Sequence, residues 1–210
     1  MSIGYACLNI GTPNTNIRSV MQRNANPEKL TEATEHNLEA LEKMLDYNIA
    51  NDLRLYRISS DLIPFGSSPV NALDWPEIHK EAFERVGAKI RKSGMRVSLH
   101  PGQYTVLNSP TEDVVARAIA DLIYHDKILA ALGTDTINKI VMHIGGIYGD
   151  KEAALDCFTE NFQKLPASVQ NRLIIENDDR LYNIDDVLTL AHRLHVPAVY
   201  DKLHHCLFNT

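Results

Sequence analysis

The chain has 210 residues, of which 44% are hydrophobic, and this length and composition favour a single globular domain with a substantial core. Its formal net charge of −6 argues against a protein that binds nucleic acid mainly through bulk electrostatic attraction. The three scattered cysteines, the lack of a signal-peptide pattern and the lack of a membrane-length apolar run lead us to expect a cytoplasmic protein without a membrane partner.

Short apolar runs alternate along the chain with longer amphipathic stretches, which is typical of βα units. Residues 27–50 carry apolar side chains at helical spacing after Asn26 and Pro27, which fit the N-cap and the first helical position. Further helices are expected from Pro76 to Gly94, from near Pro110 to Gly133, and after Lys151 and Asn183. Candidate strands cover residues 3–9, 53–59, 96–100, 139–143, 172–176 and 198–201.

Each candidate strand ends at or next to a polar residue: Asn9, Ser59, His100, His143, Glu176 and Asp201. In a parallel barrel the carboxyl ends of all strands open on one face, so residues far apart in sequence converge there. We therefore predict an α/β fold, a TIM-type (β/α) barrel with parallel strands, as one domain over residues 1–210. An open Rossmann-like sheet is the alternative, but no glycine-rich phosphate fingerprint follows the first run.

Two histidines and a glutamate stand at the ends of three successive runs. His100 ends one run in SLHPGQY, and His143 ends the next in VMHIGG, where Gly145 and Gly146 allow a ligand to approach the backbone. Glu176 follows three apolar residues in LIIENDD, where a carboxylate is costly to bury without a cation or another partner. Imidazole and carboxylate groups together suit zinc or manganese.

The sixth run adds Asp201 and His204 in VYDKLHH, three residues apart in the expected loop, and His205 could share their role. We predict a multinuclear metal site from these residues, because such clusters activate water and stabilise charge on attacking and leaving oxygens. Asp178 and Asp179 have a plainer reading as helix caps or solvated side chains. The ligand pattern alone leaves two enzyme classes open, a phosphodiester-cleaving nuclease and a metal-dependent sugar isomerase or epimerase.

The motifs GYACLN, YRISSDLIPF, SLHPGQY, MHIGG, ENDD and YDKLHH occur in this order, and together they resemble the UV-damage endonuclease family. The resemblance implies DNA repair, with incision of double-stranded DNA immediately 5′ to ultraviolet photoproducts. It also implies up to three divalent metal ions, Mn²⁺ or Zn²⁺. It assigns His100, His143, Glu176, Asp201 and His204 as ligands, with Glu176, His143 and Asp201 central to catalysis.

The same resemblance implies residues that contact DNA. Gln103 and Tyr104 match the family's probing residues, which enter the helix opposite the lesion while the damaged bases are flipped out. A planar ring can fill the vacated stack, and a photodimer already weakens stacking and pairing. Tyr5 and Asn9 match positions that line the lesion pocket and active site, although Tyr5 could equally belong to the barrel core.

The chain departs from the family pattern in two places. Ser68 stands where relatives carry a histidine. The chain also reaches Thr210 after six candidate strands, whereas a complete barrel has eight. In relatives the remaining part supplies an acidic residue, histidines and a modified lysine. We therefore expect weak or no incision by this chain, and a non-catalytic remnant that binds damaged DNA is a further alternative.

Overall fold

The structure is a computed structural model that describes residues 2–208. The chain divides into two compact units, and the long helix α4, Glu112–Ala131, contributes residues to both. Unit 1 comprises Met1–His100 and Lys127–Asn138, and unit 2 comprises Pro101–Asp126 and Lys139–Thr210. The six strands follow one another in chain order, β1-β2-β3-β4-β5-β6, and every pair with a described register is parallel. This order confirms the predicted βα architecture.

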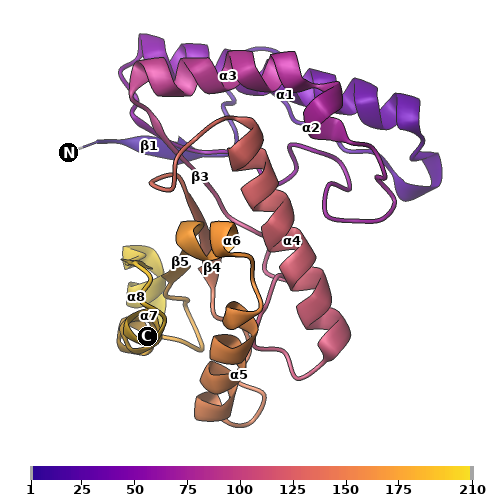
Figure 1. The fold of residues 1–210 in the computed structure, drawn as a ribbon. Helices are drawn as coiled ribbons and strands as arrows, with labels where there is room; N and C mark the ends of the chain where they lie inside the picture. Colours follow the sequence, from indigo (N-terminus) through magenta and orange to yellow (C-terminus); the bar gives the residue numbers. More distant parts are fainter. Residues whose placement is uncertain (1, 209–210) are drawn as a thin grey trace. The chain divides into compact units, whose positions relative to one another are not determined.

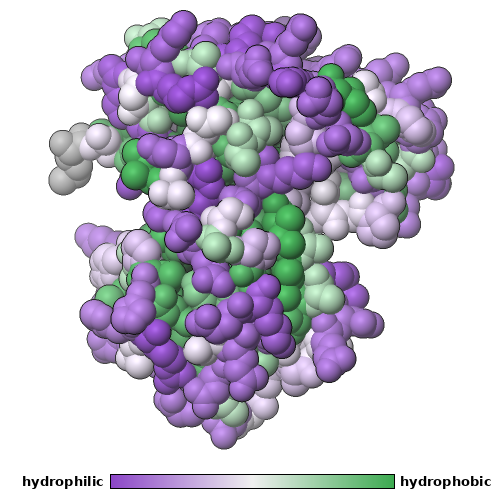
Figure 2. Space-filling view, in the orientation of Figure 1, coloured by the Kyte–Doolittle hydropathy of each residue, from purple (hydrophilic) through white to green (hydrophobic). Residues whose placement is uncertain are grey.

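Unit 1 contains three strands and the helices between them (Figure 1). These elements are β1 Gly4–Ala6, the 3-10 turn η1 Gln22–Asn24, α1 Pro27–Ala50, β2 Leu55–Arg57, α2 Trp75–Ile78, α3 Lys80–Ser93 and β3 Arg96–Leu99. Helices α1 and α3 pack against each other, and the exposed side of α3 is mostly hydrophilic (Figure 2). The predicted start of α1 is confirmed, since the Asn26 side chain accepts a hydrogen bond from the Lys29 amide.

The helix predicted from Pro76 to Gly94 is wrong in one respect, because it is interrupted. Residue His79 has φ −107° and ψ 23°, which separates α2 from α3. His79 is buried, with only 6% of the residue exposed, and Trp75 and Phe83 in the same segment are buried too. Gly94 ends α3 as predicted, in the left-handed conformation with φ 66°.

Burial of His79 gives unit 1 a pH-sensitive stability. Desolvation lowers the pKa of His79, and Glu35 on α1 opposes that shift only in part. Below pH 6.5, the ordinary pKa of histidine, the unfolded chain therefore binds a proton at residue 79 more readily than the folded chain does. The unfolding free energy consequently falls as the pH is lowered through that value. We expect His79→Leu to flatten this dependence in urea titrations between pH 7 and pH 5. Replacement of the exposed His192 by glutamine serves as the control and leaves it unchanged.

Unit 2 contains the other three strands. Its elements after α4 are β4 Lys139–His143, α5 Lys151–Gln163, α6 Ala167–Arg172, β5 Leu173–Glu176, α7 Ile184–Leu194, β6 Ala198–Val199 and α8 Lys202–Phe208. All four residues of β5 and the middle three of β4 are buried, as expected for strands covered on both faces. Asn183 caps α7 with a capping box, and helix α7 packs on β5. No described helix has the length and apolar character needed to cross a bilayer.

Candidate functional site

The candidate site begins with two neighbouring strand ends in unit 2. His143 is the last residue of β4 and Glu176 the last residue of β5, and parallel pairing places them opposite each other in the sheet. The His143 Nε2 atom lies 3.5 Å from Glu176 Oε2, with 27% and 5% of the two side chains exposed. The sequence prediction that these two residues converge is confirmed.

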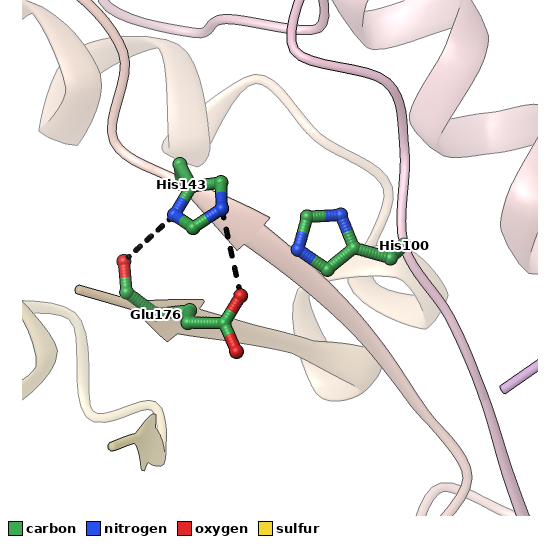
Figure 3. Close-up of side chains that lie close together, drawn as sticks. All are labelled: His100, His143 and Glu176. Atoms are coloured by element: carbon green, nitrogen blue, oxygen red, sulfur yellow. Dashed lines mark hydrogen bonds and ion pairs between the residues drawn. The ribbon is translucent and has the colours of Figure 1, made fainter. Parts of the chain in front are cut away.

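The His143 ring is oriented by the backbone of its partner strand. Its Nδ1 atom lies 3.3 Å from the Glu176 carbonyl oxygen, so the ring lies between the carbonyl and the carboxylate of one residue (Figure 3). Because a carbonyl oxygen can only accept, this contact is a hydrogen bond only when Nδ1 carries a proton. The neutral ring then directs the Nε2 lone pair at the Glu176 carboxylate. Two electron-rich atoms that face each other in a mostly buried place need a cation or a proton between them.

His100 joins this pair. It is the last residue of unit 1 and is bonded directly to Pro101, the first residue of unit 2. One ligand atom from each of His100, His143 and Glu176 lies within 4.8 Å of the other two. Two imidazoles and one carboxylate are a donor set that suits zinc or manganese, and a tetrahedral zinc site with three protein ligands keeps one position open. The donor set and the orientation of His143 both fit a bound divalent cation.

Asp201 and His204 lie in unit 2 but outside this group of three. The predicted loop around them is wrong, because residues 202–208 form helix α8. Asp201 caps that helix, since its Oδ1 atom accepts from the His204 amide at 2.9 Å. The His204 ring lies near His143, with ring centroids 5.2 Å apart, and its Nδ1 is 2.9 Å from the Asn177 carbonyl. Both histidines therefore hold Nδ1 against a backbone carbonyl, which leaves Nε2 to bind a metal.

Asn177 is the residue of this region that sequence reasoning missed. It is completely buried directly after Glu176, and its side chain makes two hydrogen bonds with the backbone of Asp201. The amide nitrogen donates to the Asp201 carbonyl at 3.0 Å, and the amide oxygen accepts from the Asp201 amide at 2.8 Å. Its position within ENDD was the available signal. The next residue, Asp178, is half-buried and accepts from three backbone amides of its own loop, so it is not the helix cap that the plainer reading allowed, a place that Asn183 takes.

The space next to Gly145 and Gly146, the glycine pair after His143, is occupied by other residues of the chain. Gly145 has φ 117°, and a Cβ atom built there would lie 2.4 Å from Asn108 Oδ1. A Cβ at Gly146 would lie 2.7 Å from the ring of Tyr148. We expected these glycines to admit a ligand. The neighbours found there instead are Asn108, Val106 and Tyr148 of the chain itself.

Gln103 and Tyr104 lie at the tip of an exposed turn in unit 2. The Thr105 amide donates to the Gly102 carbonyl at 2.9 Å, which closes the turn around them. Tyr104 is 84% exposed, whereas Pro101 before the turn and Leu107 after it are buried. The predicted projection of both side chains from a tight turn agrees with this geometry.

Tyr5 and Asn9 lie together in unit 1. The Asn9 Nδ2 atom donates to the Tyr5 hydroxyl at 3.2 Å, and the Tyr5 ring packs edge-on against buried Tyr56. Burial raises the pKa of Tyr5, and its hydrogen bond with Asn9 opposes that shift. Asn9 also lines an open pocket of about 220 Å³ formed by the loop that follows β1. Ser68 lies in the same unit, where its hydroxyl accepts from the Val70 amide.

Comparison with known sequences gives consistent matches. The sequence model of a family described as UV-endonuclease UvdE matches residues 2–210. A "UV DNA damage endonuclease" from Clostridium perfringens is 43% identical over 99% of this chain and 50% of its own length. One of the same name from Bacillus cereus is 37% identical over 85% of this chain and 56% of its own length. The chain thus spans about half the length of these curated relatives.

Solved structures agree on the fold. A crystal structure titled SacUVDE superposes with a TM-score of 0.96 at 34% identity, over all of this chain and 72% of that one. Endonuclease IV from Thermus thermophilus superposes with a TM-score of 0.55 at 17% identity, over 79% of this chain and 59% of that one. A D-psicose 3-epimerase from Clostridium cellulolyticum gives a TM-score of 0.56 at 13% identity with the same coverage. The last two likenesses concern the fold alone, so they do not distinguish a nuclease from an epimerase.

Proposed function

The chain belongs to the UV-endonuclease UvdE family, and from that premise we propose that it forms part of a metal-dependent DNA repair endonuclease. The proposed reaction is hydrolysis of the phosphodiester bond immediately 5′ to an ultraviolet photoproduct in double-stranded DNA. The observation that carries the proposal is the convergence of His100, His143 and Glu176 at strand ends in a chain of this family. An epimerase function has no comparable support, because the resemblance to epimerases is limited to the fold.

The proposed metal ligands are His100, His143 and Glu176, with Asp201 and His204 as ligands of neighbouring ions. A divalent cation bound there supplies Lewis acidity to a phosphate oxygen and lowers the pKa of a bound water. The fixed Nδ1 contacts of His143 and His204 keep each imidazole in one orientation. The two hydrogen bonds between the Asn177 side chain and the Asp201 backbone fix Asp201, and with it the start of α8, next to the end of β5.

The proposed DNA contacts come from two separate places in the chain. Gln103 and Tyr104 are exposed at the tip of a short closed turn, so the tyrosine ring can enter a base stack without first being uncovered. Asn9 lines an open pocket and donates a hydrogen bond to the Tyr5 hydroxyl, and an amide and a hydroxyl are groups that suit contacts with polar base edges. Cationic metal sites would also offset the acidic net charge of −6 where a phosphate binds.

The test is strand incision on a duplex that carries one defined cyclobutane dimer, with added Mn²⁺, beside an undamaged duplex. We expect weak or no cleavage by this chain alone and cleavage 5′ to the dimer by the longer protein of which we propose it forms part. In that protein we expect His143→Ala to reduce the rate by more than about 100-fold, since even outer partners of metal ligands are worth about 10–100-fold. His192→Ala is the matched control because His192 is exposed on α7. Incision that His143→Ala leaves intact, or that does not discriminate between the duplexes, would contradict the proposal.

A further inference from the structure

The exposed turn that carries Gln103 and Tyr104 is fastened to a helix by one short hydrogen bond. The hydroxyl of Thr105 donates to Asp121 Oδ2 at 2.6 Å, and Asp121 belongs to α4. This length is typical of a hydroxyl bound to an ionised carboxylate, the stronger class of hydrogen bond. Only 9% of Thr105 and 22% of the Asp121 side chain are exposed, so water competes weakly for either group.

Asp121 lies one turn before a buried histidine of the same helix, His125. The ring of His125, which is 1% exposed, places Nδ1 2.6 Å from the Asp121 carbonyl and 3.7 Å from its carboxylate Oδ2. The carboxylate thus lies between a buried imidazole and the Thr105 hydroxyl. An anchor whose own position is fixed transmits that position to the group bound to it.

The segment that follows the turn is fastened at two more points within unit 2. The Leu107 carbonyl accepts from Asn161 Nδ2 on α5 at 2.7 Å. The Asn108 side chain donates to the Gly146 carbonyl in the loop after β4, also at 2.7 Å. Residues 105, 107 and 108 are buried and are hydrogen-bonded to α4, α5 and the loop after β4, respectively. Gln103 and Tyr104, just before them, are exposed.

A side chain that must enter a base stack loses less conformational entropy if its backbone is already fixed. We propose that Thr105 and Asp121 are positioning residues for photoproduct recognition, which hold the 102–105 turn so that Gln103 and Tyr104 are presented to the DNA. The inference rests on the proposed function. Neither Thr105 nor Asp121 is required to touch DNA or metal, since their role acts through the two residues of the turn.

The test compares Thr105→Val, which keeps the shape and removes the hydroxyl, with Thr105→Ser, which restores it. Binding is measured by fluorescence anisotropy with Mn²⁺, on a dimer-containing duplex with a phosphorothioate linkage 5′ to the dimer to slow incision, and on its undamaged counterpart. Hydrogen exchange of the peptide that spans residues 101–108 is measured on the same proteins. We expect Thr105→Val to lower the preference for damaged DNA about tenfold and to speed exchange in the turn, whereas Thr105→Ser matches the wild type.

The outcomes separate this inference from the function on which it rests. A wild type without preference for the dimer overturns the proposed function and the recognition role together, while the exchange data still report whether the bond holds the turn. A wild type with preference and a Thr105→Val variant that keeps it overturn the positioning role alone. Equal loss in Thr105→Val and Thr105→Ser would also overturn it, because the hydroxyl would then be irrelevant.

Discussion

Replacing Glu176 with glutamine is expected to remove most of the stabilisation that Mn²⁺ gives the wild-type protein. A ligand present at about 100 times its dissociation constant raises the unfolding free energy by about 2.7 kcal/mol. Glutamine has nearly the same shape, but it lacks the negative charge that a divalent cation requires at this position. The measurement is thermal unfolding of both proteins with Mn²⁺ and with a chelator, followed by incision assays on the dimer duplex.

The same substitution is expected to leave the stability of the metal-free protein close to that of the wild type. Glu176 is only 4% exposed, and glutamine keeps its size and shape in this buried place. A glutamine amide can instead donate a hydrogen bond to His143 Nε2, which lies 3.5 Å from the carboxylate. Lower metal-free stability would indicate that the carboxylate has a structural partner more important than a metal.

The matched control is Asp179→Asn, which makes the same chemical change three residues later. Asp179 has 38% of its side chain exposed and its described ion pair, with Arg180, is loose at 3.4 Å. We expect that variant to keep the full response to Mn²⁺. If Glu176→Gln also keeps it, Glu176 is not a metal ligand.

Truncation of Arg172 to alanine is expected to lower the unfolding free energy by about 3–5 kcal/mol. Arg172 ends α6 directly before β5, and its Nε atom lies 2.9 Å from Asp126 Oδ1 on α4. The two side chains are only 7% and 14% exposed, so the variant leaves a carboxylate buried without its guanidinium. The positive charge of Arg172 also adds to burial in lowering the pKa of Lys139. Urea unfolding followed by circular dichroism measures the loss.

Two further variants separate the ion pair from general damage. Arg193→Ala removes an exposed pair with Asp156 on α5, where N–O is 2.7 Å, and exposed pairs are typically worth about 0–1 kcal/mol. The double variant Arg172→Met, Asp126→Leu replaces the buried pair with apolar side chains, and we expect it to recover most of the lost stability. A single Arg172→Ala variant as stable as Arg193→Ala would mean that the pair contributes little.

The fold was largely predictable because buried parallel strands leave a clear mark in sequence. Strand β4 has its predicted bounds, since three buried residues lie between Lys139 and His143. The other strands are shorter than predicted for reasons that depend on tertiary structure. Cys7 has φ 60°, which turns the chain out of the sheet after Ala6 although its amide still bonds the Arg57 carbonyl.

The site was predictable to the extent that its residues end strands. His143 and Glu176 were found because each follows an apolar run, and parallel pairing sets them side by side. Helix α8 was missed because Asp201 was considered only as a ligand, although aspartate is also a common helix cap. The Thr105 bond to Asp121 joins residues sixteen positions apart through tertiary packing, so no local pattern in the sequence indicates it.

Asn177 has a consequence for how the sheet ends. The β5–β6 ladder reaches Glu176 and Val199, and beyond it the Asn177 side chain meets the Asp201 backbone through one donor and one acceptor. A primary amide presents the same two groups as a peptide unit, so this side chain imitates one more rung of the ladder. The main chain of Asn177 is thereby released from pairing, and its carbonyl is available to His204. An aspartate there would keep the acceptor and lose the donor, so the hydrogen bond to the Asp201 carbonyl would be lost directly before helix α8.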